Sequence, residues 1–485
     1  MKSGIEFGAG RTRLNRGETM AEISHSMPAQ GAPGAGDKAG VRLPFVRKIG
    51  FGIGDFAFNL YWQSTTLYLL YYYTDVVGIA PGVAGAIFGG AMLWDAVFDP
   101  VMGYIANHTR TRWGRYRPYL LFGCVPLAVS FVAMFVPNRL EGVAQLAFVV
   151  STHALFRTAY TVLSMPYNAL MATLTVDSRE RGSLAAYRMV CAATAGVLVA
   201  LSTLRLVQVL GGGNAKTGFL WVNVLYATVA VFVFVMTFLS TKEAIVPDQH
   251  RVSIRDALLV IVRNRAFVIV FGFAILHMTS STLLSKTLPY VLKYCMHRED
   301  LIGWALGAVA LQVFVSIPFW AWVMRRTSKR WVALAGACIT AMSYGLLGVT
   351  GLPGLGMLLA VLVAIGFGNA AMLLAQWAMI PDTVEYGEWR TGIRGEGVIF
   401  GVVALAQKAA LALAVGAVGQ ILEAIGFAAN RVQPARTLDG LWAMLWKGPL
   451  VFTAMAIVLV LLYPISSEVH ARILGILRLR RSAAG

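Results

Sequence analysis

Apolar runs of about twenty residues recur from about residue 50 to about residue 465, and this pattern restricts the fold more than any other feature. A helix of about 20 residues crosses a hydrocarbon core of about 30 Å, and about twelve of the runs are long enough. Of the 485 residues, 58% are hydrophobic and 13% are charged, too few charges to cover a soluble protein of this length. The sequence therefore predicts an all-α polytopic membrane protein with twelve transmembrane helices.

The longest polar interruption divides the predicted spans into two groups of six. A basic loop follows the second span of each group, at residues 107–117 and 325–330, and such weak internal symmetry is expected of a duplicated transporter. We therefore expect two six-helix bundles. The expected parts are a disordered extension over residues 1–44, bundles over residues 45–240 and 266–466, a central cytoplasmic loop over residues 241–265, and a basic tail over residues 467–485.

The extension over residues 1–44 contains no apolar segment, so we expect neither a signal peptide nor a span there. Met20 and Met27 are candidates for the true start of translation. The net charge of +18 would suggest nucleic acid in a soluble protein, but here the basic residues lie in alternate gaps between spans. The positive-inside rule places those gaps in the cytoplasm. We expect a bacterial inner-membrane protein with both termini in the cytoplasm and no nucleic-acid partner.

Two aspartates, Asp95 and Asp99, lie one helical turn apart inside the second apolar run. An acidic side chain near the middle of a bilayer costs roughly 2.5 to 3.5 kcal/mol, so both should face a wet cavity or a bound cation. At positions i and i+4 they lie on one face of a helix, where a cation or a proton would relieve their repulsion. We interpret the pair as the coupling site of a cation-driven transporter.

Long basic side chains also lie inside apolar runs. Lys408, deep in the eleventh run, is the natural counterpart of the aspartates, with snorkelling to the interface as the alternative. Lys286 in the seventh run has the same two interpretations. Arg157 in the fourth run indicates an anion nearby, and Pro166 with the hydroxyls beside it suggests a broken helix that lines a cavity. Packing alone is the alternative explanation for Pro166.

A basic loop after the second span and an acidic segment after the tenth carry opposite charges on the predicted cytoplasmic side. Ion pairing between them across the two halves would lock that side shut. A plain topological anchor for the arginines and a solvated loop for the acids are the alternatives. The predicted gate residues are Arg112, Arg115, Arg179, Arg181, Asp382, Glu385 and Glu388.

Signatures of soluble catalysts are missing from the sequence. We find no Walker loop, no zinc-ligand spacing and no nucleophile elbow. We therefore expect a transporter and not an enzyme, with no cofactor other than a co-transported H+ or Na+, and with an ion gradient as its energy source.

Together the motifs resemble the glycoside/pentoside/hexuronide:cation symporters of the major facilitator superfamily, whose best known members are melibiose permeases. The resemblance spans about residues 48 to 410. The matching residues are Gly54-Asp55-Phe56 with Asn59, Tyr72-Tyr73-Thr74-Asp75, Trp94-Asp95-Ala96 with Asp99-Pro100, Arg112-Trp113-Gly114-Arg115, Arg188, Asp382-Thr383-Val384-Glu385-Tyr386-Gly387-Glu388, and Lys408.

The resemblance implies a sugar that moves with Na+, Li+ or H+ through a cavity between two bundles. It places the cation at Asp95 and Asp99, with Thr161 and Lys408 nearby. It places the sugar near Asp55, Asn59, Ser164 and Arg188. To these the polar and aromatic residues of the spans add Trp62, Arg157, Tyr160 and Trp377. We expect a small-molecule sugar or glycoside as the substrate and a monomer in the lipid bilayer.

This chain departs from the melibiose-type pattern at three positions. Phe98 replaces an asparagine, which removes an oxygen ligand and argues against Na+ selectivity. Asn59 and Ser164 replace acids, so melibiose itself is a poor candidate substrate. Arg157, without an acid beside it, suggests an anionic substrate such as a hexuronide. Transport of lysophospholipids or other organic anions by the same fold, and a non-transporting receptor, are the alternatives.

Overall fold

The computed structural model describes residues 43–175, 178–243, 263–352, 354–392 and 396–484. The chain from Leu43 onward forms one compact unit, and its regular structure in the described ranges is helical apart from an isolated bridge between Thr111 and Gly114. The expected disorder of residues 1–44 and most of the central loop lie outside the described residues.

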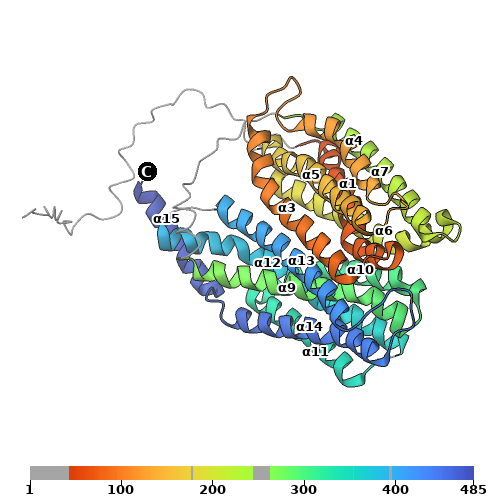
Figure 1. The fold of residues 1–485 in the computed structure, drawn as a ribbon. Coiled ribbons are helices and arrows are strands. Elements are labelled where there is room, and N and C mark those ends of the chain that lie inside the picture. The colour runs from red at the N-terminus through yellow and green to blue at the C-terminus, as the bar shows by residue number, and fades with distance from the viewer. Residues whose placement is uncertain (1–42, 176–177, 244–262, 353, 393–395, 485) are drawn as a thin grey trace, which may run out of the picture. The chain divides into compact units, whose positions relative to one another are not determined.

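The helices follow one another in two groups (Figure 1). The first group contains α1 (Phe45–Gln63), η2 (Ser64–Tyr68), α2 (Leu69–Tyr71), η3 (Tyr72–Val77), α3 (Pro81–His108), α4 (Arg117–Ala133), α5 (Gly142–Leu174), α6 (Ser178–Gly211) and α7 (Ala215–Ser240). The second group contains α9 (Arg265–Tyr290), η4 (Val291–Cys295), η5 (Glu299–Leu301), α10 (Ile302–Arg326), α11 (Lys329–Thr350), α12 (Leu355–Thr391), α13 (Glu396–Ala424), α14 (Ala435–Leu461) and α15 (Ser467–Ala484).

Ten of the described helices are long and apolar enough to cross a membrane. Two further segments complete the predicted set. Helix α4 is apolar but only 17 residues long, and the first run is divided by the π turns η2 and η3. The described chain therefore contains the twelve expected spans, which confirms the predicted all-α class.

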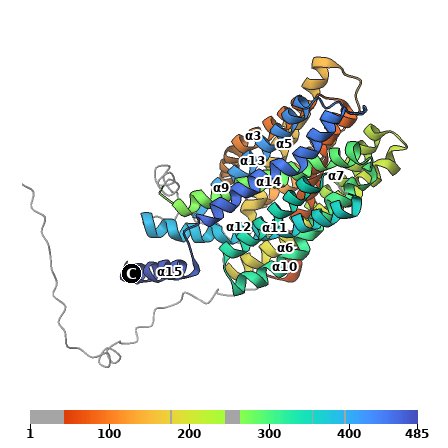
Figure 2. The same cartoon turned by 90° about the horizontal axis from the view of Figure 1, so that it is seen from below.

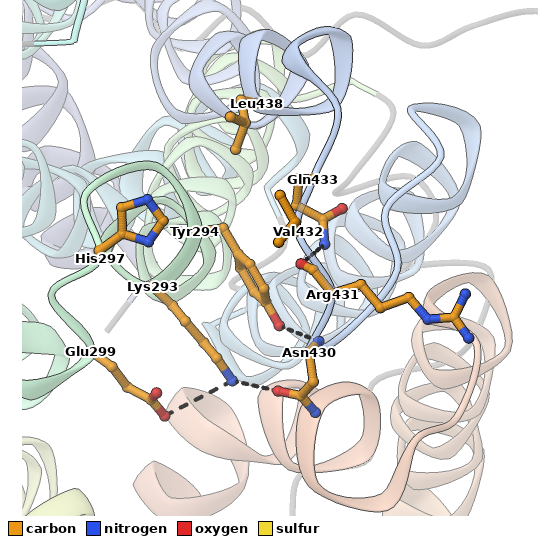
Figure 3. A pocket seen from close by; sticks show the side chains of 9 residues that line it. All are labelled: Lys293, Tyr294, His297, Glu299, Asn430, Arg431, Val432, Gln433 and Leu438. Atoms are coloured by element: carbon orange, nitrogen blue, oxygen red, sulfur yellow. Dashed lines mark hydrogen bonds and ion pairs between the residues drawn. The ribbon is translucent and has the colours of Figure 1, made fainter.

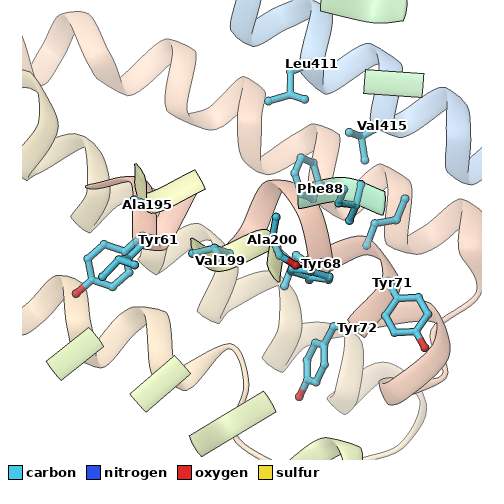
Figure 4. Packing of buried hydrophobic residues seen from close by; sticks show 14 of the residues in the cluster. Tyr61, Tyr68, Tyr71, Tyr72, Phe88, Ala195, Val199, Ala200, Leu411 and Val415 are labelled. Carbon is cyan, nitrogen blue, oxygen red and sulfur yellow. Dashed lines mark hydrogen bonds between the residues drawn. The ribbon is translucent and has the colours of Figure 1, made fainter. Parts of the chain in front are cut away.

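Small residues let α3 of the first half approach α13 of the second half closely. A Cβ added to Gly85 would lie 2.9 Å from the Cα of Gly419, and one added to Gly89 would lie 3.0 Å from the carbonyl oxygen of Ala412. Close backbone approach of this kind replaces the hydrophobic driving force that is absent in lipid. Figure 4 shows Phe88 of α3 next to the apolar side chains that α13 contributes to this core.

The predicted break at Pro166 is wrong, because α5 runs without interruption from Gly142 to Leu174. The irregular turns lie instead in the first span, where hydroxyl groups satisfy backbone carbonyls. Ser64 donates to the carbonyl of Leu60 at 2.7 Å, and Thr65 donates to that of Tyr61 at 3.1 Å. Within a membrane, backbone groups that leave the helical pattern need such partners.

The basic tail forms a helix of its own. One side of α15 is apolar, and its Ile473 and Leu477 belong to the same buried cluster as Ile380 and Val384 of α12. Figures 1 and 2 both show α15 beside the end of α12. The tail is therefore an amphipathic helix docked on the second half.

Candidate functional site

The two aspartates of α3 meet one lysine and one threonine. Lys408 Nζ lies 2.9 Å from Asp95 Oδ2 and also pairs with Asp99. The Thr161 hydroxyl hydrogen-bonds to Asp95 and lies 3.1 Å from Asp99 Oδ1. Asp95 is fully buried, whereas the side chains of Asp99 and Lys408 are each 18% exposed. We call these four residues the carboxylate site.

Three helices position the carboxylate site. Asp95 and Asp99 share one face of α3 because they are one turn apart, and Thr161 faces them from α5 in the same half. Lys408 comes from α13 in the other half. The site therefore spans both halves, and its formal charge of −1 leaves room for one more positive charge.

Asp55 is neutralised within the first half. It forms an ion pair with Arg188 of α6, whose Nη2 also donates to Asn168 Oδ1 at 2.7 Å. The Tyr167 hydroxyl donates to Asp55 Oδ2 at 3.0 Å, and the Asn59 amide donates to the Asp55 carbonyl at 2.9 Å. Sequence reasoning missed Tyr167 and Asn168, although a polar pair directly after a proline inside an apolar run was a usable signal.

Arg157 lies on α5, one turn before Thr161, and has no exposed surface. Its Nη2 contacts the sulfur of Met92, and its guanidinium carbon lies 5.2 Å from the centre of the Trp62 ring. Its Nε and Nη1 have no hydrogen-bond partner in the described part of the chain. The guanidinium is therefore buried without a neutralising carboxylate among those residues.

Lys286 on α9 does not snorkel. Its side chain is 1% exposed, its Nζ donates to the backbone carbonyl of Thr66, and the ammonium lies 4.6 Å from the centre of the Phe88 ring. Thr66 and Phe88 belong to the first half. Lys286 thus reaches across the interface between the halves.

The other predicted substrate residues separate into two groups. Tyr160 packs against Trp62 with ring centres 6.0 Å apart, and Ser164 is buried one turn further along α5. Trp377 on α12 is 42% exposed, and within the described chain it makes no hydrogen bond or ring contact with the others. Its neighbour Gln376 takes the inward position on α12, and the next residue of a helix points about 100° away.

Comparison with known proteins gives a family. The family model described as MFS/sugar transport protein matches residues 50–467. The chain belongs to this family. The predicted resemblance to sugar symporters of the major facilitator superfamily is thereby confirmed, and further relatives are named as symporters.

Two relatives of this chain are of particular interest. An isoprimeverose transporter of Lactiplantibacillus pentosus is 29% identical, over 87% of this chain and 89% of that protein. A protein named as a candidate sulfoquinovose importer of Salmonella typhimurium is 29% identical, over 85% of this chain and 88% of that protein. The solved inward-facing structure of a bacterial homologue of the human lysosomal transporter Spinster matches this chain with a TM-score of 0.66. The match covers 89% of this chain and 99% of that one. At 12% sequence identity it supports the fold alone.

In this family member the arginine loop after α3 is engaged within its own half. Glu243 accepts hydrogen bonds from the backbone amides of Arg115, Tyr116 and Arg117 at 2.8 to 2.9 Å. The guanidinium of Arg112 lies over the Trp113 ring at 4.2 Å. Glu243 is therefore the acid that the loop contacts, and sequence reasoning did not assign it.

The acidic segment of α12 is likewise engaged within the second half. Asp382 pairs with Lys329 of α11 at 2.6 Å, and His470 of α15 contacts both Asp382 and Glu385. Among the described residues, no ion pair joins this segment to Arg112 or Arg115. The side chains of Arg179 and Arg181 lie outside the described residues, and Glu388 makes an interaction of its own. The described contacts of Arg112, Arg115, Asp382 and Glu385 include no cross-half ion pair, and the gate as a whole stays a prediction.

The halves are tied at the opposite end, where η3 and η4 lie. Lys293 of η4 pairs with Asp75 of η3 at 2.9 Å, Tyr294 hydrogen-bonds to the same carboxylate, and Asn430 donates to the Asp75 carbonyl at 2.6 Å. Figure 3 shows Lys293 between Glu299 and Asn430 at a cavity of about 480 Å³. The sequence motif contained Asp75, but its role as a tie between the halves was not predicted.

Proposed function

We propose that this protein is a secondary active transporter that moves a sugar or glycoside together with H+ or Na+ by alternating access. The observation that carries the proposal is the contact of Lys408, from one half, with Asp95 and Asp99 of the other half. Membership in a sugar transport family supports the transported class. We propose a monomer in the bacterial inner membrane as the working unit.

The carboxylate site supplies a coupling mechanism. A proton or Na+ bound at Asp95 and Asp99 competes with the Lys408 ammonium for the same oxygens. Release of Lys408 removes a tie between the halves, so the bound cation changes the equilibrium between their arrangements. Because linkage is reciprocal, a sugar that favours the released arrangement tightens cation binding by the same factor.

We propose H+ as the first coupling ion to test. Na+ is a hard cation that is best held by several oxygen ligands, and Phe98 offers none. The Phe98 ring instead stacks on Trp94, with ring centres 6.2 Å apart and planes at 10°. Protonation of one carboxylate requires no further ligand and relieves the repulsion between the pair.

We propose that the sugar binds on the first-half surface formed by α1, α5 and α6. The Asp55–Arg188 pair, the Asn59 amide and the Ser164 hydroxyl offer donors and acceptors, and Trp62 and Tyr160 offer aromatic faces. Trp377 of the second half joins this site in a conformation that brings α12 closer. Rocking of the two halves around a central site is the motion common to such transporters.

The charges at the two ends support an orientation and a gate. We propose that the η3–η4 end faces the outside and that the arginine loops and both termini face the cytoplasm, in keeping with the positive-inside rule. When the Asp75 tie at the outer end opens, Arg112, Arg115, Arg179 and Arg181 approach Asp382, Glu385 and Glu388 and close the cytoplasmic end.

Transport of organic anions is the second candidate function. The unpaired, buried guanidinium of Arg157 favours it, and one relative is named as an importer of a sulfonated sugar. Lysophospholipid cargo has no comparable support among the described contacts.

The proposal is tested by uptake of labelled glycosides, pentosides and glucuronides into proteoliposomes, with an imposed pH gradient and with or without Na+. Asp95→Asn should abolish concentrative uptake and keep substrate exchange, because only coupling needs the carboxylate. Asp300→Asn is the matched control, since Asp300 lies far along the chain in an exposed pair with Arg298. Concentrative uptake at the wild-type level by Asp95→Asn would contradict the assigned coupling site.

A further inference from the structure

Among the described residues, Arg157 is the one arginine that is completely buried and has guanidinium nitrogens without a hydrogen-bond partner. An ionised side chain without a partner is expensive in a low-dielectric interior, and natural proteins pair or hydrogen-bond such groups. Its near neighbours are the Met92 thioether and the rings of Trp62 and Phe156, none of which carries a formal charge. The structure therefore leaves a positive charge for which the described chain supplies no anion.

A second buried basic side chain comes from the other half. Lys286 of α9 is 1% exposed, and its ammonium lies 4.6 Å from the centre of the Phe88 ring, which also contacts His153, one turn before Arg157 on α5. Its hydrogen bond is to the backbone carbonyl of Thr66, and it forms no ion pair with a carboxylate of the described chain. Arg157 and Lys286 are thus two buried basic side chains, one from each half, that have no carboxylate partner among the described residues.

A third group offers hydrogen bonding in the same region. His153 lies one turn before Arg157 on α5 and is 1% exposed. Its Nδ1 lies 3.3 Å from the Tyr73 hydroxyl, and its Nε2 has no partner in the described chain. The Phe88 ring contacts both the His153 ring, at 5.7 Å between centres, and the Lys286 ammonium, so His153 and Lys286 lie against the same ring.

We propose that Arg157 and Lys286 form a binding site for the anionic group of the transported solute, a carboxylate or sulfonate on a sugar-sized molecule. The inference rests on the proposed transport function and names the substrate class for it. A planar guanidinium binds carboxylate and sulfonate oxygens through two parallel N–H groups, one of which is on Nη2. In Arg157, Nε and Nη1 are unpartnered in the described chain, and Nη2 contacts the sulfur of Met92. The flexible Met92 side chain is the group that the anion displaces.

The Arg157–Lys286 site lies close enough to the carboxylate site to take part in cation coupling. On α5, Arg157 and Thr161 are one turn apart, and Thr161 belongs to the carboxylate site. An anion at Arg157 and a cation at Asp95 therefore attract each other across a short distance, and each strengthens binding of the other. Because Lys286 comes from the second half, the anion also draws the halves together around the solute.

The test measures binding without any gradient. The purified full-length chain in detergent is heated with matched acidic and neutral sugars, glucuronate against glucose and galacturonate against galactose, and with a glucose 6-sulfonate. At least one acidic sugar should raise the unfolding midpoint at a concentration at least tenfold lower than its neutral partner. Arg157→Gln and Lys286→Gln should each abolish this preference, whereas Arg157→Lys should retain part of it.

Controls separate the outcomes. Arg205→Gln removes a cation that lies over Trp304 outside the site and should keep the full preference. Asp95→Asn should lose concentrative uptake but keep the preference, so that failure of symport and failure of the anion site are told apart. If acetate alone reproduces the shift, the site is supported and takes a free carboxylate. If no acidic sugar exceeds its neutral partner, or if the preference survives in both glutamine variants, the proposal is overturned.

Discussion

The carboxylate site and the Arg157–Lys286 site lie one helical turn apart on α5, and they handle charge in opposite ways. At the carboxylate site the chain supplies the counter-ion, because Lys408 pairs with both Asp95 and Asp99. At the Arg157–Lys286 site the described chain supplies none. The difference indicates that in the first site a bound cation replaces the Lys408 ammonium. In the second site, an anionic solute provides the missing counter-ion.

The largest expected effect comes from removing the internal counter-ion. Lys408→Met leaves Asp95 and Asp99 buried together without a positive charge, and breaking a buried pair in this way costs about 3 to 5 kcal/mol. The unfolding free energy at neutral pH should fall by this amount. Lys408→Met combined with Asp95→Asn should recover most of it, because a single carboxylate remains. Equal stability of Lys408→Met and the wild type would contradict the role of Lys408 as the counter-ion of the two aspartates.

At the Arg157–Lys286 site, we expect a substitution to increase stability and not to lower it. Arg157→Met removes an unpaired buried charge and replaces it with an apolar side chain, so the protein without solute should become more stable by about 1 to 3 kcal/mol. The same unfolding measurement in the absence of sugars and organic anions checks this. Arg188→Met is the matched comparison: it breaks the pair with Asp55 and should destabilise. A loss of stability in Arg157→Met would show that the described surroundings do compensate the charge.

A smaller effect is expected at the η3–η4 end, where Lys293 of the second half pairs with Asp75 of the first. Lys293→Gln weakens the tie to Asp75, so the halves should separate there more often. A cysteine placed at the fully buried Thr287, in a chain without its four native cysteines, should then react several-fold faster with a polar thiol reagent. The pair Arg298 and Asp300 is exposed and lies within one half, so Arg298→Gln should leave the labelling rate unchanged.

The smallest effect concerns ion choice at the carboxylate site. Phe98→Asn adds an oxygen ligand beside Asp99, so Na+ should stimulate uptake a few-fold more in this variant than in the wild type. Uptake at fixed pH with Na+ or choline as the added cation measures the change. Phe98→Leu, which adds no oxygen, is the control. Equal stimulation in both variants would mean that residue 98 does not face the bound cation.

Several parts of the site followed from local spacing. Helix geometry alone puts Asp95 and Asp99 on one face, and the cost of burying acids in a membrane required a counter-ion for them. Lys408 was the appropriate choice because few basic residues lie so deep in a span. One expectation failed where local spacing carried no information. Pro166 does not break α5. The role of Trp377 stays a prediction, because in the described arrangement its neighbour Gln376 is the buried residue.

The charged loops show the same limit. The arginine loop and the acids of α12 have opposite signs, and their pairing was a reasonable expectation from sequence. In the described contacts, Glu243 binds the loop amides, Lys329 pairs with Asp382, and His470 contacts Glu385. Opposite charge identifies compatible partners, but the conformation of the halves selects which of them come within reach.

By itself, the sequence determined the helical class, the twelve spans and the carboxylate pair, because hydrophobic length and the 3.6-residue helical repeat are local properties. Only the tertiary structure decided that Lys408 reaches the aspartates, that Lys286 reaches Phe88 of the other half, and that Asp75 ties the η3–η4 end. These contacts join residues more than a hundred positions apart. They depend on how closely glycine-lined helices such as α3 and α13 pack, which side-chain spacing along one helix does not encode.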